Sequence, residues 1–175
     1  VSSAYRLHVE AGGHLTIDGE DLTFNKGLVS CAGEFVLRNG VLDMGGSEFR
    51  ADYTPHTESG GVVVCGEQAR FIMDGGVIRS AKVLASTGGV RVCCNASFVM
   101  NGGTITDIHN ESQTDAGPVL VYAGNTLLGK GAASFTMNGG VIENNTNYRG
   151  GGVHVTGKEY TYRASMEMNG GIIRN

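Results

Sequence analysis

The chain has 175 residues, a formal net charge of −4 and 17% charged residues. This acidic balance argues against a nucleic-acid-binding surface, which would be basic. No apolar run approaches the about 18 residues of a membrane helix, and the length predicts one domain over residues 1–175. Glycine is over-represented: it makes up 29 of 175 residues, whereas its usual share is about 7%.

One phrase recurs five times and organises the chain. Each copy has two apolar residues two positions apart, then a turn of the Asn-Gly-Gly type, then a further apolar pair. The copies begin at residues 35, 71, 98, 135 and 166. Repetition at intervals of 36, 27, 37 and 31 residues is typical of a solenoid with variable insertions.

A second phrase, glycine followed by alternating valines, precedes the last four copies. It occupies residues 61–64, 89–92, 117–121 and 152–155. Residues 28–30 form a degraded version, and fainter strand patterns lie at 7–9 and 15–19. Apolar residues recur at every second position, which indicates strands and not helices. Such short strands are unstable alone, so we expect each to pair with its equivalent in the next repeat.

Stacking the repeats about 4.8 Å apart places like residues in columns. One predicted core column contains Phe35, Phe71, Phe98, Phe135 and Met166. The others are Leu37, Met73, Met100, Met137 and Met168; Leu42, Ile78, Ile105, Ile142 and Ile173; Val62, Val90, Val119 and Val153; and Val64, Val92, Val121 and Val155.

The residues between the core positions are predicted to point outward, and the Asn-Gly-Gly element is predicted to form a corner. Glycine accepts the positive φ of a sharp bend, and asparagine tolerates it. Stacked amide side chains can also form a hydrogen-bonded ladder along the axis. The predicted ladder positions are Asp74, Asn101, Asn138 and Asn169.

These phrases resemble the Phe-x-Met-x-Gly-Gly-x-Ile and Gly-Gly-Gly-Val-x-Val repeats of right-handed parallel β-helix proteins of the pectate-lyase-like class. They look most like the repeats of large surface proteins from Gram-positive gut bacteria. The pattern is more distantly similar to chlamydial polymorphic outer-membrane proteins and to the β-helix part of lacto-N-biosidase-type glycosidases. The resemblance covers residues 15–175 and implies an all-β, right-handed parallel β-helix of five to six coils. No catalytic motif of these families is matched.

The first functional hypothesis is a non-enzymatic module of a secreted or cell-surface protein. It would be a stalk or adhesin-like segment whose loops contact glycans or host and cell-surface molecules. No cap is visible at the C-terminus, so further coils or a neighbouring subunit are expected to stack at the ends. The alternative is part of a carbohydrate-active enzyme, either a glycosidase or a polysaccharide lyase. The sequence predicts no cofactor, no nucleic-acid partner and no membrane insertion.

The insertions between strands hold the candidate ligand-binding residues. Aromatic faces and planar donors suit sugars, so the loop at 156–165 and the preceding repeat predict a stacking platform. The alternative is that these tyrosines only cover the core. The candidates are Tyr122, Tyr160, Tyr162 and Arg163, with Tyr148 and Arg149 on the opposite row of loops.

Carboxylates in the loop at 106–118 are the candidates for catalysis. A glycosidase needs two carboxyl groups about 5–9.5 Å apart, and Asp107 and Asp115 are the pair to test. The alternative is that both are ordinary solvated loop carboxylates.

The four cysteines show an unexpected regularity. Cys31, Cys65 and Cys93 each end a valine strand, which predicts one column of thiols, and Cys94 is an extra residue. A Cys-Cys pair binds a metal only with further ligands, and no C-x-x-C motif or nearby histidine pair exists. The sequence therefore predicts no metal site. Adjacent repeats could bring two cysteines within the about 5–6 Å between Cα atoms that a disulfide needs, although free thiols are favoured.

Overall fold

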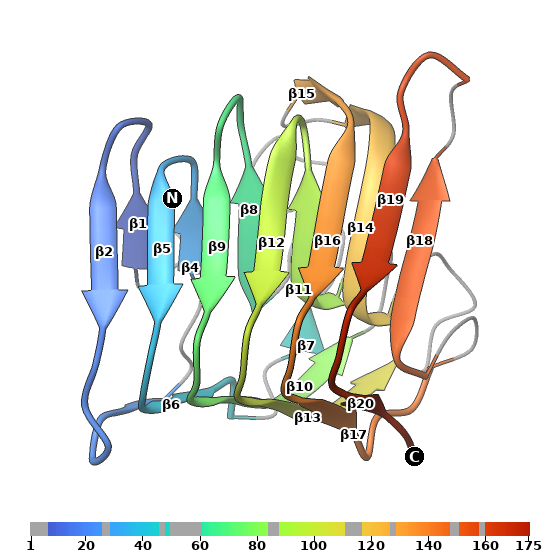
Figure 1. Ribbon diagram of the computed structural model, residues 1–175. Helices are drawn as coiled ribbons and strands as arrows, with labels where there is room; N and C mark the ends of the chain where they lie inside the picture. Colours follow the sequence, from blue (N-terminus) through green and yellow to red (C-terminus); the bar gives the residue numbers. More distant parts are fainter. Residues whose placement is uncertain are drawn as a thin grey trace.

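Three sheets of parallel strands run along the molecule, and successive repeats add their strands from one end to the other (Figure 1). The computed structural model describes residues 7–25, 29–45, 48–49, 61–83, 88–110, 117–126, 129–147, 151–157 and 160–175. All regular structure in these ranges is β, which confirms the all-β prediction. They hold no helix of the length and hydropathy that crossing a membrane would need. The arrangement is compatible with a parallel β-helix or solenoid.

Each sheet takes one strand from each repeat, and we name the sheets by their main core residues. The valine sheet consists of β1 (Leu7–Val9), β4 (Val29–Cys31), β8 (Val62–Cys65), β11 (Gly88–Cys93), β14 (Gly117–Thr126) and β18 (Val153–Gly157). The Phe/Met sheet consists of β2 (His14–Ile17), β5 (Glu34–Leu37), β9 (Arg70–Met73), β12 (Ala96–Met100), β16 (Ala133–Met137) and β19 (Ala164–Met168). The isoleucine sheet consists of β3 (Thr23–Asn25), β6 (Val41–Asp43), β10 (Val77–Val83), β13 (Thr104–Asn110), β17 (Val141–Glu143) and β20 (Ile172–Ile173).

Two short strands extend these sheets. β7 (Glu48–Phe49) pairs with β10 beyond the end of β6. β15 (Gly129–Gly131) pairs antiparallel with the end of β14, so residues from Gly124 onward form a hairpin. This hairpin is the one antiparallel pairing among the described strands. It is therefore an addition to the repeat, and it lies beside the candidate site described below.

The register of the strands confirms the predicted core columns. Phe98 pairs with Phe71 on one side and with Phe135 on the other. The methionine, isoleucine and valine columns align in the same way, because equivalent residues pair across every junction that the prediction named. Leu15 and Ile17 of β2 add one further level to the Phe/Met sheet. A continuous apolar core therefore runs between the three sheets.

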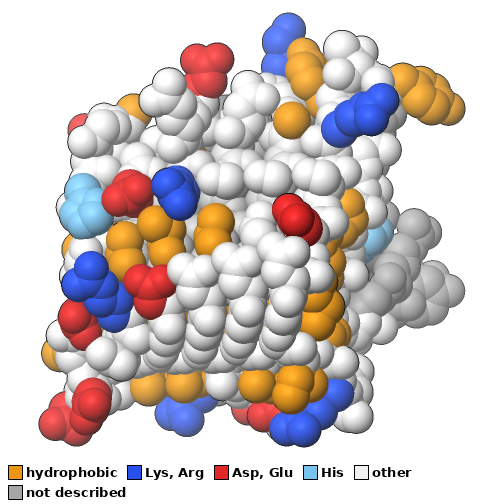
Figure 2. Space-filling model, in the orientation of Figure 1, with side chains coloured by type: hydrophobic (Ala, Val, Ile, Leu, Met, Phe, Trp, Pro, Cys, Tyr) orange, Lys and Arg blue, Asp and Glu red, His pale blue; other side chains and the backbone are white. Residues whose placement is uncertain are grey.

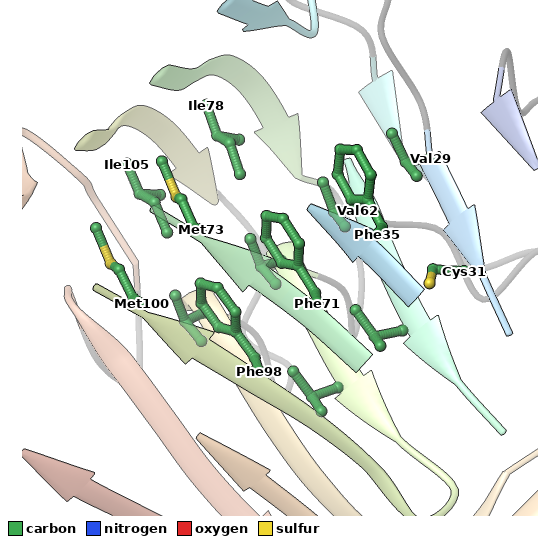
Figure 3. Packing of buried hydrophobic residues seen from close by; sticks show 14 of the residues in the cluster. Val29, Cys31, Phe35, Val62, Phe71, Met73, Ile78, Phe98, Met100 and Ile105 are labelled. Atoms are coloured by element: carbon green, nitrogen blue, oxygen red, sulfur yellow. The ribbon is translucent and has the colours of Figure 1, made fainter. Parts of the chain in front are cut away.

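Four phenylalanine rings form a stack along this core, and Figure 3 shows three of them, Phe35, Phe71 and Phe98. Ring centroids of Phe35, Phe71, Phe98 and Phe135 are 4.9, 4.7 and 4.7 Å apart, and neighbouring planes differ by 9°, 7° and 8°. All four side chains are buried. Because the backbones of paired strands lie about 4.8 Å apart, the sheet spacing itself sets the distance between the rings.

A ladder of amide side chains follows the corners, as the sequence predicted. Asn101 Nδ2 donates to Asp74 Oδ1 at 2.8 Å, Asn138 Nδ2 to Asn101 Oδ1 at 2.9 Å, and Asn169 Nδ2 to Asn138 Oδ1 at 3.0 Å. Asp74 can only accept, and it occupies the end of this ladder where only an acceptor is required. The ladder is exposed, so it holds neighbouring corners in register from the outside.

Replacing Asn138 with alanine is expected to lower the free energy of unfolding by about 1–3 kcal/mol, since it removes two ladder hydrogen bonds worth about 0.5–1.5 kcal/mol each. Asn169→Ala is the matched control because it removes only one of the ladder bonds. Urea unfolding of both variants measures the difference. Equal losses in the two variants would contradict an additive ladder.

The outward positions of the valine sheet include buried side chains. Arg91 and Leu120 point outward by strand alternation, yet they are only 5% and 1% exposed. The reason is a second apolar cluster, which forms on this outer face and contains Leu120 and Tyr122. On the Phe/Met face, Figure 2 shows scattered charged side chains of both signs and a small apolar area. The two sheets therefore differ in what covers their outer side.

Candidate functional site

Three cysteines meet on the outer side of the valine sheet. Val64 and Val92 pair in register and point into the core, where both are fully buried. The next residues, Cys65 and Cys93, also pair in register. Because successive side chains of a strand point to opposite faces, both thiols point away from the core.

The third thiol reaches the other two through a turn. Cys94 and Asn95 follow β11 with φ values of 58° and 67°, in the left-handed region. The Gly66 N–H donates to the Cys94 carbonyl at 3.2 Å, which ties this turn to the turn after β8. As a result, the Sγ atoms of Cys65, Cys93 and Cys94 all lie within 4.8 Å of one another. We call these three residues the thiol cluster.

The hairpin formed by β14 and β15 lies against the thiol cluster. Cys94 Sγ is 3.3 Å from the Thr126 hydroxyl, and a Cβ on Gly129 would lie 3.5 Å from that sulfur. Cys93 and Cys94 pack with Leu120 and Tyr122 and are buried, whereas Cys65 is partly exposed. The cluster is therefore shielded by protein on most sides, and Cys65 is its most accessible member.

A buried arginine supplies positive charge near the thiols. The Arg91 guanidinium carbon lies 5.5 Å from the centroid of the Tyr122 ring, within the range of a cation–π contact. Hydrogen bonds from the Cys65 and Cys93 thiols, aided by Thr126 and Arg91, lower the pKa of Cys94. The mutual hydrogen bonds and burial raise the pKa of Cys65. These opposite directions make Cys94 the most readily ionised thiol of the cluster.

Cys31 does not belong to this cluster: the predicted column of thiols is confirmed for Cys65 and Cys93 and is wrong for Cys31. Cys31 pairs with Val64 and not with Cys65. A shift of one residue moves a side chain to the other face of a sheet, so Cys31 points into the core. Its thiol donates to the Gly33 carbonyl at 3.2 Å, and burial raises its pKa to about 11.

The thiol cluster is not apparent from the sequence, because no further ligand lies next to the Cys-Cys pair along the chain. The third thiol is that of Cys65, which lies at the end of β8 in the neighbouring repeat. The alignment of Cys65 with Cys93 was visible in the sequence, but the direction of Cys94 was not. All four cysteines are free thiols in the structure. Three thiols at this spacing can bind a soft cation or exchange into a disulfide.

The structure separates the residues of the predicted sugar platform. Tyr160 is fully exposed, Tyr162 is partly exposed and Arg163 is exposed in the segment before β19. Tyr122 is only 7% exposed and packs in the cluster with Cys93 and Leu120, so it is not on a surface with the other three. Tyr148 and Arg149 lie outside the described residues. Ligand binding by Tyr160, Tyr162 and Arg163 stays a prediction.

Asp107 occupies a bend within β13, and Asp115 lies outside the described residues. Asp107 is exposed and has a φ of 55°, while Ser80 in β10 has a φ of 64°. Pairing between the two strands skips this position, passing from Arg79↔Thr106 to Ala81↔Ile108. Asn144, with a φ of 54°, continues the same bend in the next repeat. Aspartate tolerates the left-handed conformation, so Asp107 has a structural reason to be there whether or not it acts in catalysis.

Comparisons with protein-family models, with curated proteins and with solved structures found no match to this chain. The resemblance to pectate-lyase-like β-helices therefore stays a prediction from the repeat phrases.

Proposed function

We propose that the chain is a right-handed parallel β-helix of five to six coils that serves as a non-enzymatic module of a secreted or cell-surface protein. The observation that supports this most directly is the register of equivalent residues in all three sheets. Such stacking gives every repeat the same neighbours, so stability accumulates along the axis and the module acts as a spacer. The insertions are then free to vary in sequence and to carry the contacts of the protein.

The loop before β19 is the surface that we assign to glycan contact. Tyr160 is fully exposed, although a tyrosine ring usually gains stability from burial. Arg163 is exposed in the same segment, and its backbone is held because the Ala133 N–H donates to the Arg163 carbonyl at 3.1 Å. An anchored loop with a free aromatic face and a planar donor suits the C–H and hydroxyl groups of a sugar ring.

A glycan array probed with the wild-type chain and with the Tyr160→Ala/Tyr162→Ala double variant tests this proposal. The wild type is expected to retain a defined set of glycans. The double variant is expected to lose at least about tenfold in affinity, on the scale of the about 1–3 kcal/mol that one stacked ring contributes in single-stranded nucleic-acid complexes. Thr161→Ala is the matched control in the same loop. Absence of glycan retention by the wild type, or equal retention by the double variant, would contradict glycan contact by this loop.

The non-enzymatic part of the proposal has a separate test. Oligosaccharides incubated with the wild type are expected to stay intact, as measured by mass spectrometry of the products. Turnover that disappears in Asp107→Asn would contradict the proposal and favour a carbohydrate-active enzyme.

A further inference from the structure

We propose that Cys65, Cys93 and Cys94 form a binding site for one thiophilic metal cation. The first observation in support is that three sulfur atoms converge at one place. The three sulfurs come from two neighbouring repeats and lie within 4.8 Å of one another. With metal–sulfur bonds of about 2.3 Å, the sulfurs of a three-coordinate site lie about 4 Å apart. Small side-chain adjustments therefore suffice to bring all three sulfurs to a common cation.

The donor set decides the class of cation. The cluster offers three sulfur atoms, and the described residues add no carboxylate or imidazole to it. Thiolate ligands select soft ions such as Cu⁺ and Zn²⁺, whereas Mg²⁺ and Ca²⁺ require oxygen ligands. Cd²⁺ has the same preference and serves as a probe. Three protein ligands leave a further coordination position for a small external ligand, and Cys65 is on the accessible side.

The charge around the cluster suits this class. Three thiolates and one divalent cation carry a net charge of −1, and the buried guanidinium of Arg91, two residues before Cys93 on the same face of β11, supplies a positive charge. Burial of a charge is costly unless an opposite charge accompanies it. Binding of the cation releases the thiol protons to solvent and converts the thiols to thiolates.

The backbone holds the thiols in place before any cation arrives. Cys65 and Cys93 are fixed by strand pairing, and Cys94 is fixed by a turn whose carbonyl accepts from Gly66. The Asn95 side chain also accepts from the Ala132 N–H at 2.9 Å, which anchors this turn to the segment after β15. A site held in this way loses little conformational freedom on binding.

Titration of the fully reduced chain with Cd²⁺ in the absence of oxygen tests the proposal. Ultraviolet absorption from thiolate-to-Cd²⁺ charge transfer is expected to saturate at one ion per chain. Removal of outer-shell partners of metal ligands typically weakens binding by about 10–100-fold, so Cys65→Ser and Cys94→Ala, which remove direct ligands, are expected to weaken it by more than about 100-fold. Competition with Zn²⁺ and Cu⁺ then ranks the natural candidates.

Cys31→Ala is the matched control, because Cys31 is a buried thiol in the core and not in the cluster. It is expected to keep the stoichiometry and affinity of the wild type. Since Cys65 is partly exposed, Cys65→Ser is expected to fold, and circular dichroism of every variant checks this. A reduced wild type without the charge-transfer band would overturn the proposal, as would equal Cd²⁺ affinity in a folded Cys65→Ser variant. A persistent disulfide within the cluster that excludes Cd²⁺ would overturn it in favour of a redox pair.

Discussion

Replacing Phe98 with alanine is expected to lower the free energy of unfolding by about 3–5 kcal/mol, the usual cost of truncating a buried aromatic side chain. Phe98 is fully buried and stacks on Phe71 and Phe135, with ring centroids at 4.7 Å on both sides. The strands that carry these residues are paired above and below. Their backbones cannot move together to fill the space, so a cavity remains in the middle of the stack.

Val99→Thr provides the matched control for this prediction. Val99 follows Phe98 in β12, but its side chain is on the other face of the strand and is partly exposed. A nearly isosteric change at such a position is expected to stay within about 0.5 kcal/mol. Urea unfolding followed by circular dichroism measures both variants. A cost for Phe98→Ala no larger than that for Val99→Thr would contradict a core that depends on the phenylalanine stack.

Replacing Gly103 with alanine is expected to cost about 2–5 kcal/mol, from a left-handed penalty of about 1–2 kcal/mol and an overpacking penalty of about 1–3 kcal/mol. Gly103 forms the corner after Asn101 and has a φ of 84°. A Cβ at this position would lie 2.6 Å from the Gly75 carbonyl oxygen and 2.7 Å from that of Gly76. Both atoms belong to the corner of the preceding repeat. The clash therefore opposes the stacking of one corner on the next.

Gly12→Ala separates the two parts of this cost. Gly12 has a similar φ of 77°, but a Cβ there would meet nothing within 4 Å. Only the conformational penalty of about 1–2 kcal/mol is expected for Gly12→Ala. Thermal unfolding of the two variants compares them directly. If both lost the same stability, the close approach of successive corners would contribute nothing.

The two proposals involve different parts of the surface and can fail separately. Glycan contact is assigned to the loop with Tyr160 and Tyr162, whereas metal binding is assigned to the outer side of β8 and β11. Loss of glycan retention in the loop variants would leave Cd²⁺ binding intact, and the cysteine variants would leave glycan retention intact. A change in both activities from one set of variants would indicate altered folding, and circular dichroism would detect it.

The sequence by itself determined the core of this protein. Alternation with a period of two, repeated at fixed offsets from Asn-Gly-Gly, identifies the residues that point inward and aligns them between repeats. The column of Phe71, Phe98 and Phe135 and the ladder of Asn101, Asn138 and Asn169 follow from that pattern alone. They depend only on local strand geometry and on the identity of neighbouring repeats.

The tertiary structure decided which thiols meet. Cys31 is offset by one residue from Cys65, and that offset moves it from the outer face to the core. Cys94 reaches Cys65 because its left-handed turn is tied to Gly66 of the preceding repeat and is covered by the hairpin of β14 and β15. These contacts join segments far apart in the chain and recur in no other described repeat. No periodic signal could reveal them, because a period in the sequence records only what every repeat shares.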